Sequence, residues 1–192
     1  MPNRTLSSLS QPYPYRSRIG TYQIDAFESS TCASSAVIRY GDVVAFDVNT
    51  SSANYRLVRA STTASAPTVQ STSILGVALG GSTRDGSTFG LGHAEQIPVC
   101  LATPQTEFWF ATKSSQVVSS CVGQRRALAF DSTLSIFYVN MGNSSEADAS
   151  VVITDIPEPG PWTNNGVVGR FISSGVAQLV VDIDGVEQLG GD

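Results

Sequence analysis

Residues 40–47 have the sequence YGDVVAFD, and residues 74–81 have the sequence ILGVALGG. Both are short apolar runs bounded by glycine or polar turn residues, a pattern typical of buried strands. A similar pair follows later in the chain, with RRALAFD at residues 125–131 and NGVVGRFISSG at residues 165–175. Runs of this length and composition predict an all-β fold.

The rest of the chain shows the same pattern of short apolar runs. They recur at intervals of roughly 8–15 residues and are separated by Ser, Thr, Asn, Gly or Pro, as in sandwiches and barrels. Charged residues make up 14% of the 192 residues, and Lys113 is the only lysine. Exposed helices normally use glutamate and lysine, so this composition argues against a helical protein. We expect a barrel or a sandwich of about twelve short strands.

The two Ala-Phe-Asp runs are each followed by a strand that contains a glycine, Gly76 in the first case and Gly169 in the second. Glycine inside a strand often marks a close approach of two backbones or a bend. The repetition suggests two similar β-modules, about residues 21–115 and 116–192, or two halves of one barrel. Chance similarity between short strands is the alternative.

Residues 1–20 predict an extended N-terminal arm that precedes a β-rich body of residues 21–192. In QPYPYRSR, residues 11–18, prolines between tyrosines oppose a helix and favour extended backbone. The first twenty residues carry a charge of +3 and the remainder −8, which together give the net charge of −5. We expect the arm to lie on another protein surface; the alternative is a frayed terminus. The expected contact residues are Tyr13, Tyr15, Arg16 and Arg18.

Two polar or proline-rich segments are expected to be linkers or surface loops. Residues 61–73 are small and polar, and residues 156–166 contain three prolines followed by Asn-Asn-Gly. Trp162 in the second segment either fixes the spacer to the body or binds a partner, so it joins the expected partner-binding residues. Near the C-terminus, Asp184 and Gly185 lie between two alternating runs and predict a tight hairpin.

Alternation within two strands predicts which side chains are buried. In the sequence EFWF, Phe108 and Phe110 are expected on one face of the strand and Trp109 on the other. These aromatic side chains are therefore expected in the core or in an interface. In residues 21–27, TYQIDAF, every second position is apolar, which predicts a half-buried strand.

The chain contains few residues with catalytic or metal-binding chemistry. His93 is the only histidine, and no G-x-S-x-G nucleophile motif accompanies it. Cys32, Cys100 and Cys121 are widely spaced and form no recognisable zinc set. Buried, reduced thiols are expected, with a Cys100–Cys121 bridge as the alternative. We predict no catalytic residue, no cofactor, no metal and no small-molecule substrate.

Charge and hydropathy also bear on the class of partner. Neutralising phosphates requires a dense basic face, which an acidic body lacks, so nucleic acid is not expected as a partner. No apolar run reaches the ~18 residues that a membrane span needs. The first twenty residues contain no apolar core of a signal peptide, so we expect synthesis in a cytoplasm.

Three stretches and their order resemble the small decoration, or cement, proteins of tailed-phage capsids. These are GDVVAFD at residues 41–47, ILGVAL at 74–79 and IPVCLA at 97–102. The third stretch follows a glycine-rich loop, and all three follow an extended N-terminal arm. The resemblance covers about residues 35–110. It implies a β-barrel or β-tulip-like subunit, often a homotrimer, that binds the major capsid protein outside an icosahedral shell and staples adjacent capsomers. No binding residue of that family can be carried over to a numbered position.

The expected function is therefore that of a structural protein located on the capsid surface of a virion and made in the host cytoplasm. Two other classes share the β-rich, serine-rich and threonine-rich character. One is a tail-tube, head-completion or fibre subunit. The other is a carbohydrate-binding β-sandwich, in which an exposed Trp109 or Trp162 would stack on a sugar.

Overall fold

A computed structural model of the chain describes the greater part of the predicted β-rich body and the second half of the predicted arm. The described residues are 11–28, 38–46, 57–60, 62–63, 66–69, 74–81, 96–112, 119–142, 144, 148–157 and 166–172.

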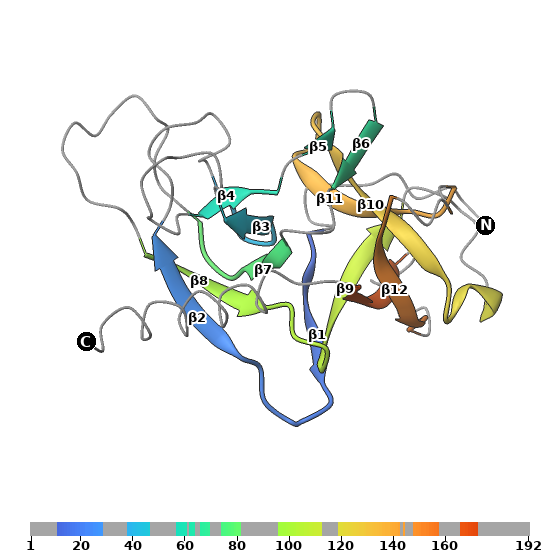
Figure 1. Cartoon of the computed structure of the whole chain (residues 1–192), viewed down its shortest axis with the longest axis horizontal. Helices are drawn as coiled ribbons and strands as arrows, with labels where there is room; N and C mark the ends of the chain where they lie inside the picture. Colours follow the sequence, from blue (N-terminus) through green and yellow to red (C-terminus); the bar gives the residue numbers. More distant parts are fainter. Residues whose placement is uncertain are drawn as a thin grey trace, which may run out of the picture.

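These residues form thirteen strands and one short 3-10 helix, so the all-β prediction is confirmed (Figure 1). The strands are β1 (Tyr13–Ser17), β2 (Ile24–Glu28), β3 (Val43–Phe46), β4 (Leu57–Arg59), β5 (Thr62–Thr63), β6 (Ala66–Val69), β7 (Ile74–Ala78), β8 (Gln96–Leu101), β9 (Thr106–Thr112), β10 (Arg125–Asp131), β11 (Ile136–Asn140), β12 (Ala149–Asp155) and β13 (Gly166–Phe171). The 3-10 helix, η3, spans Ser119–Cys121.

Five strands close into a barrel in the order β9-β13-β12-β10-β11 and back to β9. An odd number of strands cannot alternate in direction all the way round a ring, so one pair of neighbours must be parallel. That pair is β11 and β9, and its register contains only Tyr138↔Ala111 and Val139↔Thr112. The other half of the same β9 edge is paired with β1. The barrel therefore closes through the short parallel pair of β11 and β9, and β1 continues the pairing along the same edge of β9.

Five further strands form an open antiparallel sheet in the order β2-β8-β7-β3-β4, whereas β1, β6 and β5 extend the sheet of the barrel. The chain passes from this sheet to the barrel between β8 and β9, and Figure 1 shows the two units side by side. A cation–π contact also joins them, since the Arg59 guanidinium lies 4.3 Å from the centre of the Phe130 ring.

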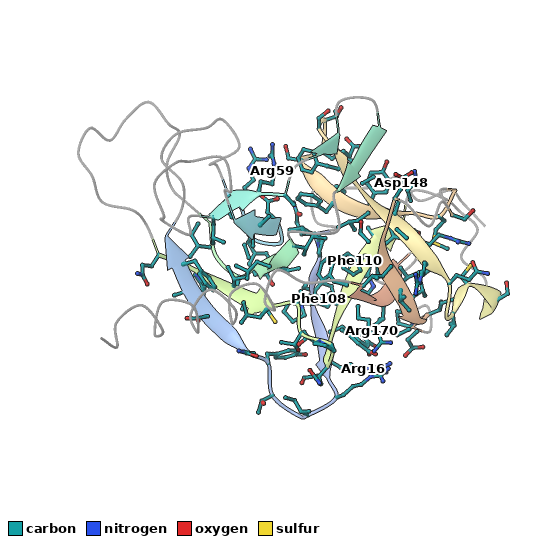
Figure 2. All side chains as sticks on the ribbon, in the orientation of Figure 1. Arg16, Arg59, Phe108, Phe110, Asp148 and Arg170 are labelled. Atoms are coloured by element: carbon teal, nitrogen blue, oxygen red, sulfur yellow. The ribbon has the colours of Figure 1, made fainter. Side chains whose placement is uncertain are left out.

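One hydrophobic core is shared by the barrel and the open sheet. It takes side chains from all five barrel strands, including Phe108 and Phe110 of β9, and from the open sheet, including Val43 and Cys100. Because members come from every strand of the ring, this set fills the inside of the barrel, and Figure 2 shows Phe108 and Phe110 where the two units meet. The described strands therefore pack around a continuous core.

The opposite faces of the strands are buried in two further clusters. Leu75 and Val99 belong to a cluster on the other face of the open sheet. Trp109 and Tyr138 belong to a cluster on the outer face of the barrel. Phe108 and Phe110 thus lie on one face of β9 and Trp109 on the other, as the alternation predicted.

The two in-strand glycines confirm the expected close approaches of backbones. A Cβ atom added to Gly76 would overlap the carbonyl oxygen of Cys100, and one added to Gly169 would overlap Val151. The two sequence copies nevertheless occupy different places. Gly76 lies opposite Val44 in an adjacent strand, whereas β12 separates β13 from β10.

The prediction that residues 61–73 form a linker or surface loop was wrong, and so was the predicted burial of one face of residues 21–27. Residues 61–73 contain β5 and β6, and Thr68 of β6 pairs with Ala129 of the barrel. The strand predicted at residues 21–27 forms as β2 from Ile24 onward, but its predicted apolar face is exposed to solvent. β2 is an end strand of the open sheet, so only one of its edges is covered by another described strand. The hairpin predicted at Asp184 and Gly185 lies outside the described residues.

Replacing Gly76 by alanine is expected to lower the free energy of unfolding by about 1–3 kcal/mol, because the new methyl group must displace the Cys100 carbonyl. The urea unfolding midpoint measures this. Gly142→Ala is the matched control, since its added Cβ meets only Asn140 Oδ1 at 3.4 Å, an ordinary contact. A Gly76→Ala midpoint equal to that of the control would contradict the close approach.

Candidate functional site: the docked N-terminal arm

Residues 11–18, here called the docked arm, lie on the body of their own chain. β1 pairs with β9, and the pairing continues past the strand because the Arg18 N–H donates to the Gln105 carbonyl at 3.0 Å. β2 then pairs with β8, beginning with a 2.9 Å bond from the Leu101 N–H to the Gln23 carbonyl. The N-terminal segment and the β8–β9 segment thus form one long antiparallel ribbon across both units (Figure 1).

A bulge at Tyr15 sets which side chains of the arm face the barrel. Tyr13 lies opposite Trp109 and Arg16 lies opposite Glu107, with Tyr15 as the extra residue between the two registers. Residues three apart in a regular strand point to opposite faces, but the inserted residue returns Tyr13 and Arg16 to the same face. The bulge therefore directs an aromatic ring and a guanidinium toward the outer face of β9.

The Trp109 indole is held between the arm and the barrel. The Tyr13 ring stacks on it with ring centres 5.2 Å apart and planes 17° from parallel. On the other side, a Cβ atom added to Gly166 would overlap the indole ring, so the ring lies directly on the glycine backbone. Stacked aromatic pairs of this kind contribute about 0.5–1.5 kcal/mol beyond their buried area.

Glu107 has no exposed side-chain surface and is paired with both arginines of the arm. Arg16 donates its Nε–H to Glu107 Oε2, while Arg18 donates from Nη2 and Nε to Oε1 at 3.0 and 3.2 Å. Arg16 also reaches Asp155 Oδ2 at 3.1 Å. The arginine side chains are 45% and 55% exposed, so water still solvates the cations while the carboxylate depends on them.

The pKa of Glu107 shows how strongly the arm stabilises the charged carboxylate. Burial raises the pKa of Glu107, but the hydrogen bonds from Arg16 and Arg18, the Arg16 charge and a bond from the Thr154 hydroxyl outweigh burial and lower it. The same hydrogen bond to Glu107 raises the pKa of Arg16. Glu107 is therefore an anion whose charge is compensated from a segment about ninety residues earlier in the chain.

The beginning of the docked arm contacts both units. Gln11 Nε2 donates to the Ser135 carbonyl, 3.1 Å away, just before β11. A Cβ atom added to Gly41 would lie 2.5 Å from Gln11 Cβ and 3.0 Å from the Pro12 carbonyl oxygen. Gly41 has a φ of +84°, in the turn just before β3, and its lack of a side chain lets the arm cross the open sheet closely.

Asp42, next to Gly41, is fully buried. Its Oδ2 accepts the Arg39 N–H at 2.8 Å, whereas its Oδ1 has no hydrogen-bond partner among the described residues. Burial raises the pKa of Asp42 from 3.8 to about 6, although the Arg39 N–H and the charges of Arg59 and Arg39 oppose the shift. The turn that contacts the arm thus contains a carboxyl group, that of Asp42, whose ionisation is opposed by burial.

An exposed apolar strip continues from the docked arm into β2. Four of the seven exposed large apolar side chains among the described residues lie within this short segment, and Ile19 is the most exposed at 68%. β2 ends the open sheet, and within the described part of the chain its outer edge has no strand partner. We use "apolar strip" for Tyr15, Ile19, Tyr22 and Ile24.

The predicted contact residues are brought together in part. Tyr13, Arg16 and Arg18 converge on β9 of their own chain, and Tyr15 projects from the bulge to solvent. Trp162 and His93 lie outside the described residues. Glu107 was missed, because an isolated glutamate in an apolar strand gives no indication of a partner so distant in sequence.

Chemistry-bearing side chains elsewhere are few in the described part of the chain. Cys100 and Cys121 are both free and buried, and burial raises the pKa of the Cys100 thiol to about 11. Within the described ranges, no group of three or more His, Cys, Asp or Glu residues is placed to hold a metal ion. None of the helices described has the length and apolar character that a membrane span requires.

No protein-family model, curated protein or solved structure matches this chain. The resemblance to capsid decoration proteins therefore rests on the short strand motifs alone.

Replacing both Arg16 and Arg18 by glutamine is expected to release the arm, because Glu107 then has no compensating charge. Release moves Trp109 into water and shifts its emission to longer wavelength; with Trp162→Phe in the background, Trp109 is the only tryptophan. The free energy of unfolding should fall by about 3 kcal/mol, the usual result of unpairing a buried ion.

Arg125→Gln is the control for this experiment, since Arg125 is an exposed arginine on β10 whose side chain pairs with no described carboxylate. Adding Glu107→Gln to the double variant should restore part of the lost stability, because an amide needs no counter-charge. An unshifted emission maximum in the double variant would show that the ion pairs do not hold the arm.

Asp42→Asn is expected to change how stability depends on pH. Because the folded pKa of Asp42 is raised to about 6, the acid stabilises the fold most when protonated, and this contribution is lost as the pH rises from about 4 to 6. Asparagine cannot ionise, so the variant should gain about 2–3 kcal/mol relative to wild type between pH 4 and pH 7.5.

Urea unfolding at these two pH values measures the relative gain. Asp25→Asn, at an exposed position on β2, is the control and should show the same difference from wild type at both pH values. If Asp42→Asn behaved like Asp25→Asn, Asp42 would be ionised in the folded protein at little cost.

Proposed function

We propose that this protein is a structural subunit of a phage virion that decorates the outside of an icosahedral capsid and staples adjacent capsomers. The observation that carries the proposal is the apolar strip beside the free edge of β2. Soluble chains usually protect such edges with charges, proline or a covering segment, and an exposed apolar edge marks a place for another protein. We propose the major capsid protein as that partner.

The electrostatics of the body support a protein partner over nucleic acid. The body beyond residue 20 carries a net charge of −8, and within the arm Arg16 and Arg18 are already paired with Glu107 and Asp155. Few cations therefore remain free on the described part of the arm for phosphate. An acidic subunit on the outside of a shell also avoids host nucleic acid.

The proposed oligomeric state and position on the shell come from the resemblance to cement proteins. It supports a homotrimer that binds at seams between capsomers, where buried area and symmetric contacts strengthen the shell without chemistry. The carbohydrate-binding alternative loses one of its two candidate side chains, because Trp109 is buried under Tyr13 and cannot stack on a sugar.

Ile24→Glu is expected to reduce binding to expanded shells of the encoding phage about tenfold or more, since burying one such apolar side chain contributes about 1.5–3 kcal/mol. Occupancy is measured by co-sedimentation of the purified protein with shells that lack it. Val122→Glu is the matched control, because Val122 is 48% exposed and Ile24 54%. Wild-type protein that never sediments with shells would refute the proposal, and full occupancy by Ile24→Glu would refute the role of the strip.

Deleting residues 1–18 is a poorer test of shell binding. Without β1, half of one edge of β9 is unpaired and both Glu107 and Trp109 lose their partners. A truncated chain would lose stability as well as any shell contact, so point substitutions on the apolar strip separate the two effects.

A further inference from the structure

We infer that the arm is exchanged between copies of this chain, so that β1 of one copy pairs with β9 of another and supplies Tyr13, Arg16 and Arg18 to its Trp109 and Glu107. This goes beyond the capsid proposal and does not depend on it, since exchange requires only the protein itself. The partner is a second copy, because the docking site is complementary to this arm in several independent ways.

The docking site on β9 is incomplete without an arm. Glu107 is fully buried and both of its cationic partners come from the arm. Trp109 is covered by Tyr13, and among the described strands β1 is the one that pairs with the edge of β9 from Thr106 to Trp109. A body whose own arm has left therefore presents an unpaired edge, an aromatic face and a carboxylate, and another copy's arm satisfies all three with the same contacts.

The connection between β1 and β2 is short, exposed and weakly held. It consists of residues 19–22, because Arg18 is still bonded to Gln105 and Gln23 is already bonded to Leu101. Only two long hydrogen bonds hold the turn within the described residues, from the Gly20 N–H to the Ser17 carbonyl at 3.2 Å and from the Ile19 N–H to Ser17 Oγ at 3.4 Å. Opening this hinge breaks little that the exchanged form does not remake.

The hinge also determines where the second copy must lie. Four extended residues span roughly 13–14 Å, so the two hinges have to run close together. Ile19 and Tyr22 are exposed in a single chain and would be covered by the neighbouring hinge. Exchange therefore explains the hinge end of the apolar strip and leaves Ile24 and the β2 edge for a different partner.

Symmetry does not restrict the exchange to one oligomer. Reciprocal exchange gives a two-fold dimer, and passing each arm to the next copy gives a closed ring. In both arrangements every Glu107 receives two arginines and every Trp109 receives a tyrosine. The Glu107 carboxylate of every copy keeps its two cationic partners.

The test uses disulfides between strands. Ser17 and Thr106 are directly opposite each other, and Ser17→Cys and Thr106→Cys both change little in size. Two differently tagged chains are co-expressed, one with each substitution and both with Cys32→Ser. After oxidation, exchange should link about half of the Thr106→Cys chains to a Ser17→Cys chain, the fraction for random mixing in a closed assembly. Non-reducing gels and mass spectrometry of the linked peptide measure it.

Two controls make every outcome informative. Val122→Cys in place of Thr106→Cys reports chance collisions, since Val122 is exposed and lies outside β9. A single chain with both substitutions reports docking of β1 on β9 in any form. The inference is overturned if the double variant closes only within single chains while the mixed chains stay unlinked, or if neither preparation forms the bond. Neither result affects shell binding, which is measured separately.

Discussion

The charge on Glu107 is the constraint on which the docking of the arm on the barrel depends. A carboxylate without exposed surface is strongly unfavourable unless cations and hydrogen bonds compensate it. Here both cations belong to the arm, while the carboxylate belongs to β9, the strand that begins the barrel. The arginines remain about half exposed, so they lose little hydration in forming the pairs. The N-terminal segment is therefore part of the fold, held by a requirement that originates in the barrel.

The topology of the barrel gives the same segment a second role. A five-stranded ring must contain a parallel pair, and here that pair is short, so half of one β9 edge is left for another strand. β1 occupies this place, and its bulge turns Tyr13 and Arg16 to the same face. Charge compensation, aromatic stacking and strand pairing thus coincide along one stretch of β9. Together they fix the register of the arm on β9.

Local features of this fold could be predicted from the sequence, whereas its long-range pairings could not. Alternation placed Phe108 and Phe110 opposite to Trp109, and the in-strand glycines Gly76 and Gly169 marked real close approaches. These depend on period and size, which neighbouring residues determine. The docking of the arm on its own chain depends on a bulge at Tyr15 and on a partner about ninety residues away. Nothing local to residues 11–18 distinguishes a surface on the same chain from a surface on another.

The same contacts can form within one chain or between two chains, and this connects the arm to assembly. Within one chain, a four-residue hinge gives the arm an effective concentration at β9 of about millimolar or higher. Once one arm has crossed to a second copy, the reciprocal arm is tethered close to its new β9 in the same way, so a closed exchanged assembly regains this advantage. The contacts that complete a single fold can therefore also join copies of the chain, because each arm finds the same edge, the same indole and the same carboxylate on its neighbour.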